Sequence, residues 1–202
     1  MKWMSAAAIA AFAVQPICAQ TASPAPATVK VALTTAQGRI VLALEKDRAP
    51  VTTANFLRYV DQKRFDGVFF YRASNAPGFP DVGFLQGGTA SDVKRTLPPI
   101  THEPTSKTGL KHEDGTISMA RLAPGTARGD WIITLGPQPY LDADPTRPGD
   151  NQGNAAFGRV IEGMDVVRAI HKGPRGANAA NPVMKGEMLE PKVRIVTARR
   201  VP

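Results

Sequence analysis

The length, composition and charge of the chain fit one globular domain with a short extra segment. The 202 residues are 43% hydrophobic and 21% charged, which excludes a disordered chain and a fibrous repeat over most of the length. The formal net charge is +8, but the basic residues are scattered, and the enriched tail, 168–200, contains no interleaved aromatic residues. This distribution favours a solvated basic surface and no nucleic-acid partner.

The first nineteen residues have the pattern of a bacterial secretory signal peptide. Lys2 supplies the positive charge, residues 6–14 are apolar, and 17–19 fit a cleavage site after Ala19. The apolar run is shorter than the roughly 20 residues that a membrane-spanning helix needs, so we expect no stable membrane insertion. Cys18, the only cysteine, lies inside this segment. The pattern predicts a periplasmic protein without thiols, and it also allows secretion from the cell.

Two β-rich runs follow the predicted signal peptide, 1–19, and a flexible leader. The leader, 20–27, is small, polar and rich in Pro. The runs 29–33 and 39–44 contain many β-branched residues and are separated by a turn, so they predict a hairpin. A helix is expected next, over 49–60, because Pro at its second residue suits a helix start.

The rest of the chain adds short strands and one more helix. Residues 163–171 carry apolar side chains at helical spacing and end before a Gly-Pro pair. The further strand candidates are 68–72, 84–86, 116–120, 131–135, 155–160 and 192–198. Without a repeating strand–helix–strand rhythm, this pattern predicts a mainly β domain over 28–202, a closed eight-stranded antiparallel β-barrel capped by two α-helices.

The usual signatures of hydrolases, nucleotide-binding proteins and metalloenzymes are absent from the sequence. The histidines are isolated from one another, so we expect surface or loop positions for His102, His112 and His171. A loose acidic cluster suggests calcium, but intervening prolines break the ligand pattern and favour a turn-rich surface loop for Asp142, Asp144 and Asp150. The sequence therefore predicts no metal and no cofactor.

Four short segments in a fixed order point to a function. They are Phe70-Tyr71-Arg72, Phe84-Leu85-Gln86-Gly87-Gly88, Ser118-Met119-Ala120 and Phe157-Gly158-Arg159-Val160-Ile161-Glu162-Gly163-Met164. They resemble the Phe-His-Arg, Phe-Met-x-Gln-Gly-Gly, Ser-Met-Ala and Phe-Gly-x-Val-x-x-Gly-Met segments of the cyclophilin family of peptidyl-prolyl cis-trans isomerases. The resemblance spans residues 29–196, nearly the whole mature chain.

The resemblance implies an enzyme that rotates the peptide bond before proline in proline-containing polypeptides, acting as a monomer in the folding of exported proteins. Unaided rotation has a barrier of about 18–20 kcal/mol. A guanidinium that donates to the prolyl nitrogen localises its lone pair and lowers this barrier. By resemblance, the catalytic residues are Arg72 and Gln86, and the substrate-binding residues are Phe84, Ala120, Asp130, Ile132, Tyr140, Leu141 and Asn154. Plain barrel core is the alternative for Phe84, Ala120 and Leu141.

Several positions depart from the family pattern. Asp130 stands where the family usually has Gln or Glu, Ile132 where it has Phe, Tyr140 where many members have Trp, and Asn154 where many have His. The smaller pocket leaves a second possibility, a cyclophilin-like binding module with little or no isomerase activity. Trp131 either compensates for the missing pocket aromatic or faces away from the pocket.

Asp130 has two possible roles. If it faces the groove, it accepts a hydrogen bond from Arg72, and replacing Asp130 by Gln raises the catalytic efficiency. Otherwise Asp130 only ends the loop 125–129, since Asp is a common turn residue.

Overall fold

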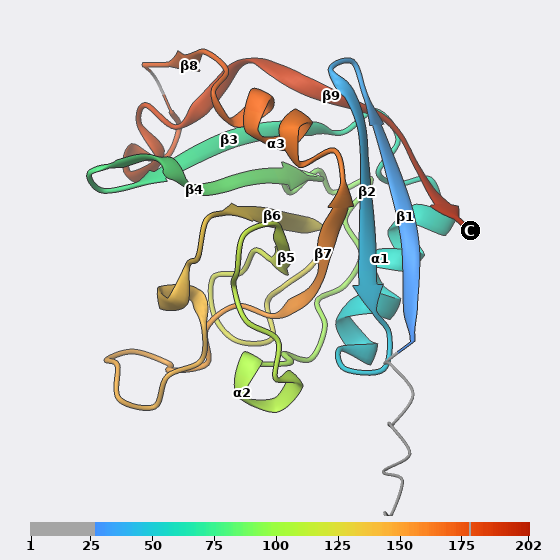
Figure 1. Cartoon of the computed structure of the whole chain (residues 1–202), viewed down its shortest axis with the longest axis vertical. Coiled ribbons are helices and arrows are strands. Elements are labelled where there is room, and N and C mark those ends of the chain that lie inside the picture. The colour runs from blue at the N-terminus through green and yellow to red at the C-terminus, as the bar shows by residue number, and fades with distance from the viewer. Residues whose placement is uncertain (1–26, 178) are drawn as a thin grey trace, which may run out of the picture.

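Eight antiparallel strands close into a barrel, as the sequence predicts (Figure 1). The computed structural model describes residues 27–177 and 179–202, so the predicted signal peptide, 1–19, and all but the last residue of the predicted leader, 20–27, lie outside the described residues. The last strand pairs with the first, which closes the sheet. Around the barrel the strands follow the order β1 (Thr28–Thr35), β2 (Gly38–Glu45), β7 (Ala156–Glu162), β5 (Thr116–Met119), β6 (Asp130–Leu135), β4 (Phe79–Gly88), β3 (Phe69–Ala76) and β9 (Met188–Val201).

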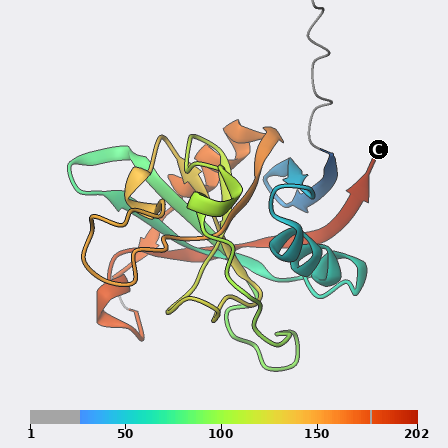
Figure 2. The ribbon, with the colours of Figure 1, turned by 90° about the horizontal axis from the view of Figure 1, so that it is seen from below.

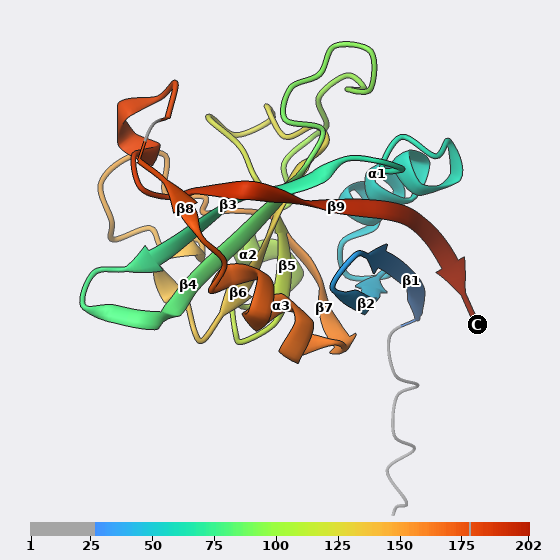
Figure 3. The ribbon, with the colours of Figure 1, turned by 90° about the horizontal axis from the view of Figure 1, so that it is seen from above.

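Strand β9 is longer than the sequence predicts and pairs with both β3 and β1. It begins at Met188 rather than at residue 192, and it continues through Pro191, which argues against a strand at the sequence level. Its first part pairs with β3 and its last part with β1, and it runs across the whole molecule beside β3 (Figure 3). A two-residue strand, β8 (Arg175–Gly176), is attached to its outer edge.

Residues 27–177 and 179–202 contain three α-helices, one more than predicted. Helix α1 (Pro50–Asp61) begins at its proline, and Figure 2 shows it on the side of the molecule opposite to the loop that precedes β7. Helix α3 (Met164–His171) contacts β2, β3 and β4. The unexpected helix, α2 (Thr105–Thr108), is a single turn that is too short for a periodic apolar pattern. None of the helices within 27–177 and 179–202 is long and apolar enough to cross a membrane.

An aromatic cluster fills the barrel interior and fixes which way β6 faces. Trp131 is fully buried and meets the ring of Phe70 edge-on, with centroids 5.3 Å apart. Phe56 from α1 packs against Phe65, with centroids 4.9 Å apart. Because neighbouring strand residues point to opposite faces, Trp131 in the core places Ile132 on the outer wall. Trp131 therefore faces away from the pocket and does not replace its missing aromatic.

His171 corrects the expectation of a surface or loop position. It lies at the end of α3 and is fully buried. Its Nε2 atom lies 3.0 Å from the backbone oxygen of Ser74 on β3, so the ring joins the helix to the strand. No local pattern could indicate this role, because the partner is a backbone oxygen 97 residues away. His102 does lie in a loop, where its Nε2 atom is 3.3 Å from the backbone oxygen of Gln152.

Candidate functional site

A pocket of about 740 Å³ opens on the outer wall of the barrel, over β3, β4 and β6. Eight of the nine predicted site residues line it: Arg72, Phe84, Gln86, Ala120, Asp130, Ile132, Leu141 and Asn154. Tyr140 is outside this lining; it is 53% exposed on the short helix η1 (Pro139–Leu141), next to Leu141. Phe84, Ala120 and Leu141 are half-buried, so they belong to the pocket wall rather than to the barrel core.

Strand register brings the central residues of the pocket into one row. Arg72 on β3 lies opposite Gln86 on β4, and Gln86 lies opposite Ile132 on β6. A bulge in β3 between Phe70 and Arg72 adds one residue to the strand, Tyr71. Phe70 can therefore point into the core while both following side chains line the pocket.

The Arg72 side chain is fixed on three sides. Its Nε and Nη2 atoms each lie 2.7 Å from Oε2 of Glu187, and its Nη1 atom donates to Oε1 of Gln86 at 3.1 Å. The guanidinium carbon lies 5.0 Å from the centre of the Phe84 ring, in cation–π range. Only 17% of the Arg72 side chain is exposed. The arrangement holds a cation at the edge of an apolar pocket.

Glu187 is a site residue that sequence reasoning missed. It lies 115 residues from Arg72 in the chain, and no motif marks it. The pairing of Arg72 with Met188 on β9 is what brings it near. The position of Glu187 could have been predicted only from the start of the last strand. If that strand is taken to begin at residue 188 and to pair with β3, the residue before it lies beside Arg72.

Of the two roles that the sequence left open for Asp130, the contact with Arg72 is not formed. Asp130 accepts hydrogen bonds from the hydroxyl of Tyr71 at 3.2 Å and from the backbone N–H of Ala90 at 2.7 Å. It lies opposite Gly88, at the end of its strand and away from the row that contains Arg72. Burial raises the pKa of Asp130 and that of Tyr71. Asp130 does line the pocket, but the premise for raising activity with a Gln at this position is lost.

The second wall of the pocket is held by backbone contacts. Asn154 donates from Nδ2 to the backbone oxygen of Met119 at 3.1 Å, and its backbone N–H donates to that of Leu141 at 2.8 Å. The backbone N–H of Ala120 donates to the backbone oxygen of Asp130 at 2.9 Å. Asn154 thus links the last residue of β5 to the last residue of η1.

Comparison with known proteins identifies the family. Residues 29–199 match the family described as cyclophilin type peptidyl-prolyl cis-trans isomerase/CLD. The chain belongs to this cyclophilin family. It is 38% identical over 143 residues to peptidyl-prolyl cis-trans isomerase A of Dickeya dadantii, covering 69% of this chain and 70% of that relative. It is also 38% identical to isomerase cyp18 of Streptomyces antibioticus, covering 81% of that relative.

A solved structure supports the same fold. A Cryptosporidium parvum cyclophilin-type isomerase, crystallised in the presence of the dipeptide Ala-Pro, superposes with a TM-score of 0.68 at 18% identity, covering 86% of this chain and 99% of that one. The expected barrel, family and enzyme class are therefore confirmed, and this cyclophilin is a peptidyl-prolyl cis-trans isomerase.

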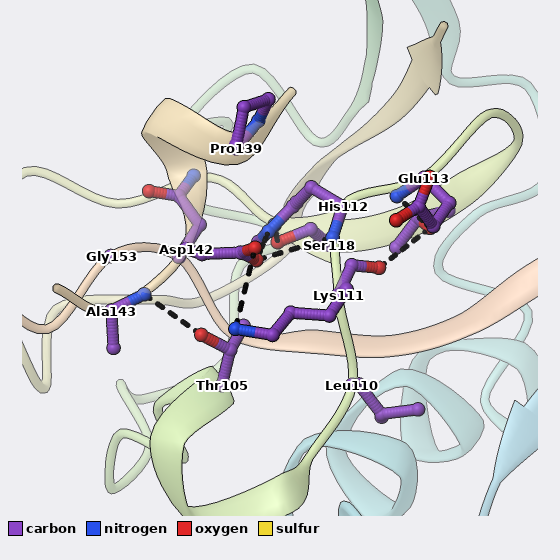
Figure 4. Close-up of polar contacts among 12 residues, drawn as sticks. Thr105, Leu110, Lys111, His112, Glu113, Ser118, Pro139, Asp142, Ala143 and Gly153 are labelled. Atoms are coloured by element: carbon purple, nitrogen blue, oxygen red, sulfur yellow. Dashed lines mark hydrogen bonds and ion pairs between the residues drawn. The ribbon is translucent and has the colours of Figure 1, made fainter. Parts of the chain in front are cut away.

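A network of polar contacts surrounds His112 in this cyclophilin (Figure 4). His112 lies between two polar side chains: its Nδ1 atom is 2.7 Å from Oδ1 of Asp142, and its Nε2 atom is 2.9 Å from the hydroxyl of Ser118. The backbone N–H of Ala143 donates to the hydroxyl of Thr105 at 2.8 Å, which ties the next residue to α2. His112 lies in a loop, as expected, but its side chain is fully buried.

Ser118, His112 and Asp142 are arranged like a Ser–His–Asp catalytic triad, but they have a structural role. Ser118 is fully buried, so no substrate carbonyl can reach its hydroxyl. Ser118 lies two residues before the pocket residue Ala120, and Asp142 directly follows the pocket residue Leu141. His112 therefore joins the two segments that form one wall of the pocket.

The three aspartates of the predicted surface loop have separate partners. Asp142 binds His112 and is largely buried, which corrects its surface placement. Asp144 accepts from the backbone N–H of Thr146 at 2.9 Å. Asp150 receives two hydrogen bonds from Arg121, at 2.7 and 2.8 Å, and this guanidinium lowers its pKa to about 2. Across 27–177 and 179–202, no three His, Cys, Asp or Glu side chains are grouped as a metal site.

Proposed function

We propose that this cyclophilin is an exported bacterial isomerase that speeds rotation about Xaa-Pro bonds in exported proteins, with Arg72 as its catalytic residue. One observation carries the proposal: the guanidinium of Arg72 is fixed at the edge of a pocket that also contains Gln86 and apolar side chains. The proposed protein acts as a monomer.

Arg72 has donors left for a substrate. A guanidinium carries five N–H donors, and the contacts with Glu187 and Gln86 occupy one each on Nε, Nη2 and Nη1. One N–H therefore remains on each terminal nitrogen. Donation from one of them to the prolyl nitrogen localises the lone pair that gives the C–N bond its double-bond character, so the twisted peptide is stabilised. No covalent bond is made or broken.

The other pocket residues orient the peptide. Ile132, Leu141 and Phe84 supply an apolar surface for the proline ring. The side-chain oxygen of Gln86 accepts from Arg72, so its amide N–H group is the part that donates to a peptide carbonyl. Tyr140, exposed beside the pocket, meets residues that flank the proline. Asp130 and Asn154 shape the two ends of the pocket.

Replacing Gln86 by Ala is expected to lower kcat/KM on an Ala-Pro peptide by about tenfold, the value of one lost hydrogen bond of about 1.4 kcal/mol. A protease-coupled assay of cis-to-trans rotation measures the change. Gln37→Ala, in the exposed β1–β2 turn, is the matched control and keeps wild-type activity. A folded Gln86→Ala protein with unchanged kcat/KM would remove Gln86 from the mechanism.

Export is tested on the full chain produced in a Gram-negative bacterium. The charged, apolar and cleavage regions of residues 1–19 predict a periplasmic protein whose first residue is Gln20. Fractionation, N-terminal sequencing and the native mass of the purified protein measure location, cleavage and the monomeric state. A chain without residues 2–19 is the control and stays in the cytoplasm. Full-length protein found only in the cytoplasm, with its leader intact, would contradict export.

A further inference from the structure

The carboxylate of Glu187 grips one edge of the Arg72 guanidinium. Oε2 of Glu187 accepts from both Nε and Nη2 of Arg72, at 2.7 Å each. The two side chains are only 17% and 23% exposed. Exposed ion pairs restrict their partners little, but a charge-assisted contact through two short hydrogen bonds in a half-buried setting fixes the orientation of the planar guanidinium.

Glu187 is itself held against the strand that carries Arg72. Its second carboxylate oxygen, Oε1, accepts from the hydroxyl of Ser74 at 2.6 Å. Its backbone oxygen accepts from the N–H of Ala73 at 2.8 Å, and its own N–H donates to the backbone oxygen of Met184 at 3.0 Å. Met184 also lines the pocket. Glu187 is therefore attached to β3 through both oxygens of its carboxylate and through its backbone oxygen.

We propose that Glu187 is a positioning residue for isomerisation, which holds Arg72 so that its remaining N–H groups face the prolyl nitrogen. This inference rests on the proposed role of Arg72. Nη1 is held by Gln86 and the face of the guanidinium by Phe84, but among the residues that the structure describes only Glu187 holds the Nε edge. Without that contact, the side chain can turn about its long stem, and a displacement of about 1 Å can reduce a rate by about 100-fold.

The negative charge of Glu187 also has an opposing effect. The carboxylate partly neutralises the positive charge of the guanidinium, which weakens the hydrogen bond that Arg72 donates to the prolyl nitrogen. The two effects separate in a Gln variant, because the side-chain oxygen of Gln can still accept from Arg72 while its amide donates to Ser74. If positioning is the larger effect, Glu187→Gln retains most of the activity that Glu187→Ala loses.

The test measures kcat and KM separately, by exchange NMR of an Ala-Pro peptide with the full mature chain. Glu187→Ala is expected to lower kcat at least about tenfold with KM changed less than about twofold, and Glu187→Gln to remain within about threefold of the wild type. Glu162→Ala is the matched control, since it removes an exposed Arg39–Glu162 pair (side chains 52% and 61% exposed) away from the pocket. Wild-type kcat in folded Glu187→Ala, a kcat in Glu187→Gln more than about threefold above or below the wild type, or a change in KM alone would overturn the inference.

A double-mutant cycle separates this inference from the proposed function. In an Arg72→Ala background, Glu187→Ala is expected to cause no further loss, because the group that it positions is gone. A second loss of the same size would overturn the inference. If Arg72→Ala itself has no effect, the proposed role of Arg72 is wrong; if Arg72→Ala loses activity and Glu187→Ala does not, only the positioning role is wrong. A second variant covers the case in which Glu187→Ala does not fold. Ser74→Ala removes the hydroxyl that holds one carboxylate oxygen of Glu187, and it is expected to lower kcat about threefold. An unchanged kcat in Ser74→Ala would overturn the inference.

Discussion

Replacing Arg72 by Ala is expected to lower kcat/KM on an Ala-Pro peptide by about 10²–10³-fold, the usual cost of removing one preorganised donor from an active site. The reaction breaks no bond, so stabilising the twisted peptide is the whole of catalysis, and Arg72 is the cation fixed at the pocket edge. The protease-coupled assay measures the loss at a temperature well below the unfolding transition of each variant.

Arg72→Lys is expected to recover little of this activity. A lysine keeps the charge, but its single nitrogen cannot contact Glu187 and Gln86 and still donate in the direction that the guanidinium fork provides. Arg39→Ala, which removes an exposed arginine, is the control with unchanged activity. Activity within threefold of the wild type in Arg72→Ala would refute the proposed mechanism and leave the family assignment standing.

Replacing His112 by Ala is expected to lower the free energy of unfolding by about 3 kcal/mol at pH 7.5. The change removes a charge-assisted hydrogen bond to Asp142, whose side chain is 12% exposed, and leaves the hydroxyl of the fully buried Ser118 without its partner. Urea unfolding measures the loss. His102→Ala is the matched control, because the half-buried His102 makes one longer contact of 3.3 Å, and we expect a loss below about 1 kcal/mol.

The same histidine makes stability depend on pH. Burial lowers the pKa of His112, against the opposing effect of Asp142, so the folded protein resists protonation of the ring. An unfolded histidine binds a proton below about pH 6.5. The unfolded state therefore binds more protons as the pH falls, and stability is complete above about pH 6.5 and decreases below it. His112→Ala is expected to lose part of this decrease between pH 6.5 and 5, and a wild-type pH slope in the variant would contradict the prediction.

Strand periodicity predicted the barrel, and the resemblance of four motifs to the cyclophilin family predicted most of the pocket. Arg72, Gln86 and Ile132 come from three adjacent strands whose register places them in one row, and their motifs mark the strands. Elements without periodicity escaped prediction: α2 is one turn, and β8 has two residues. The start of β9 was missed because Pro191 interrupts its strand pattern.

Contacts between distant segments could not be predicted from local patterns. The sequence suggested Asp130 as a carboxylate that could contact Arg72. Asp130 lies two residues along β6 from the row that contains Arg72, and it accepts a hydrogen bond from Tyr71 instead. The carboxylate that does contact Arg72 belongs to Glu187, and only the pairing of β3 with β9 brings it there. His112 looked isolated for the same reason, since Asp142 is 30 residues away in the chain.

Closure of the barrel limits how this protein can pair with other polypeptides. Because β1 pairs with β9, each of the eight barrel strands has a neighbour on both sides, and within the described residues only the two-residue β8 ends the sheet on an open side. An open strand offers unpaired backbone groups that bind any extended polypeptide and start aggregation. The closed barrel of this isomerase therefore offers extended polypeptides almost no backbone to pair with around the pocket.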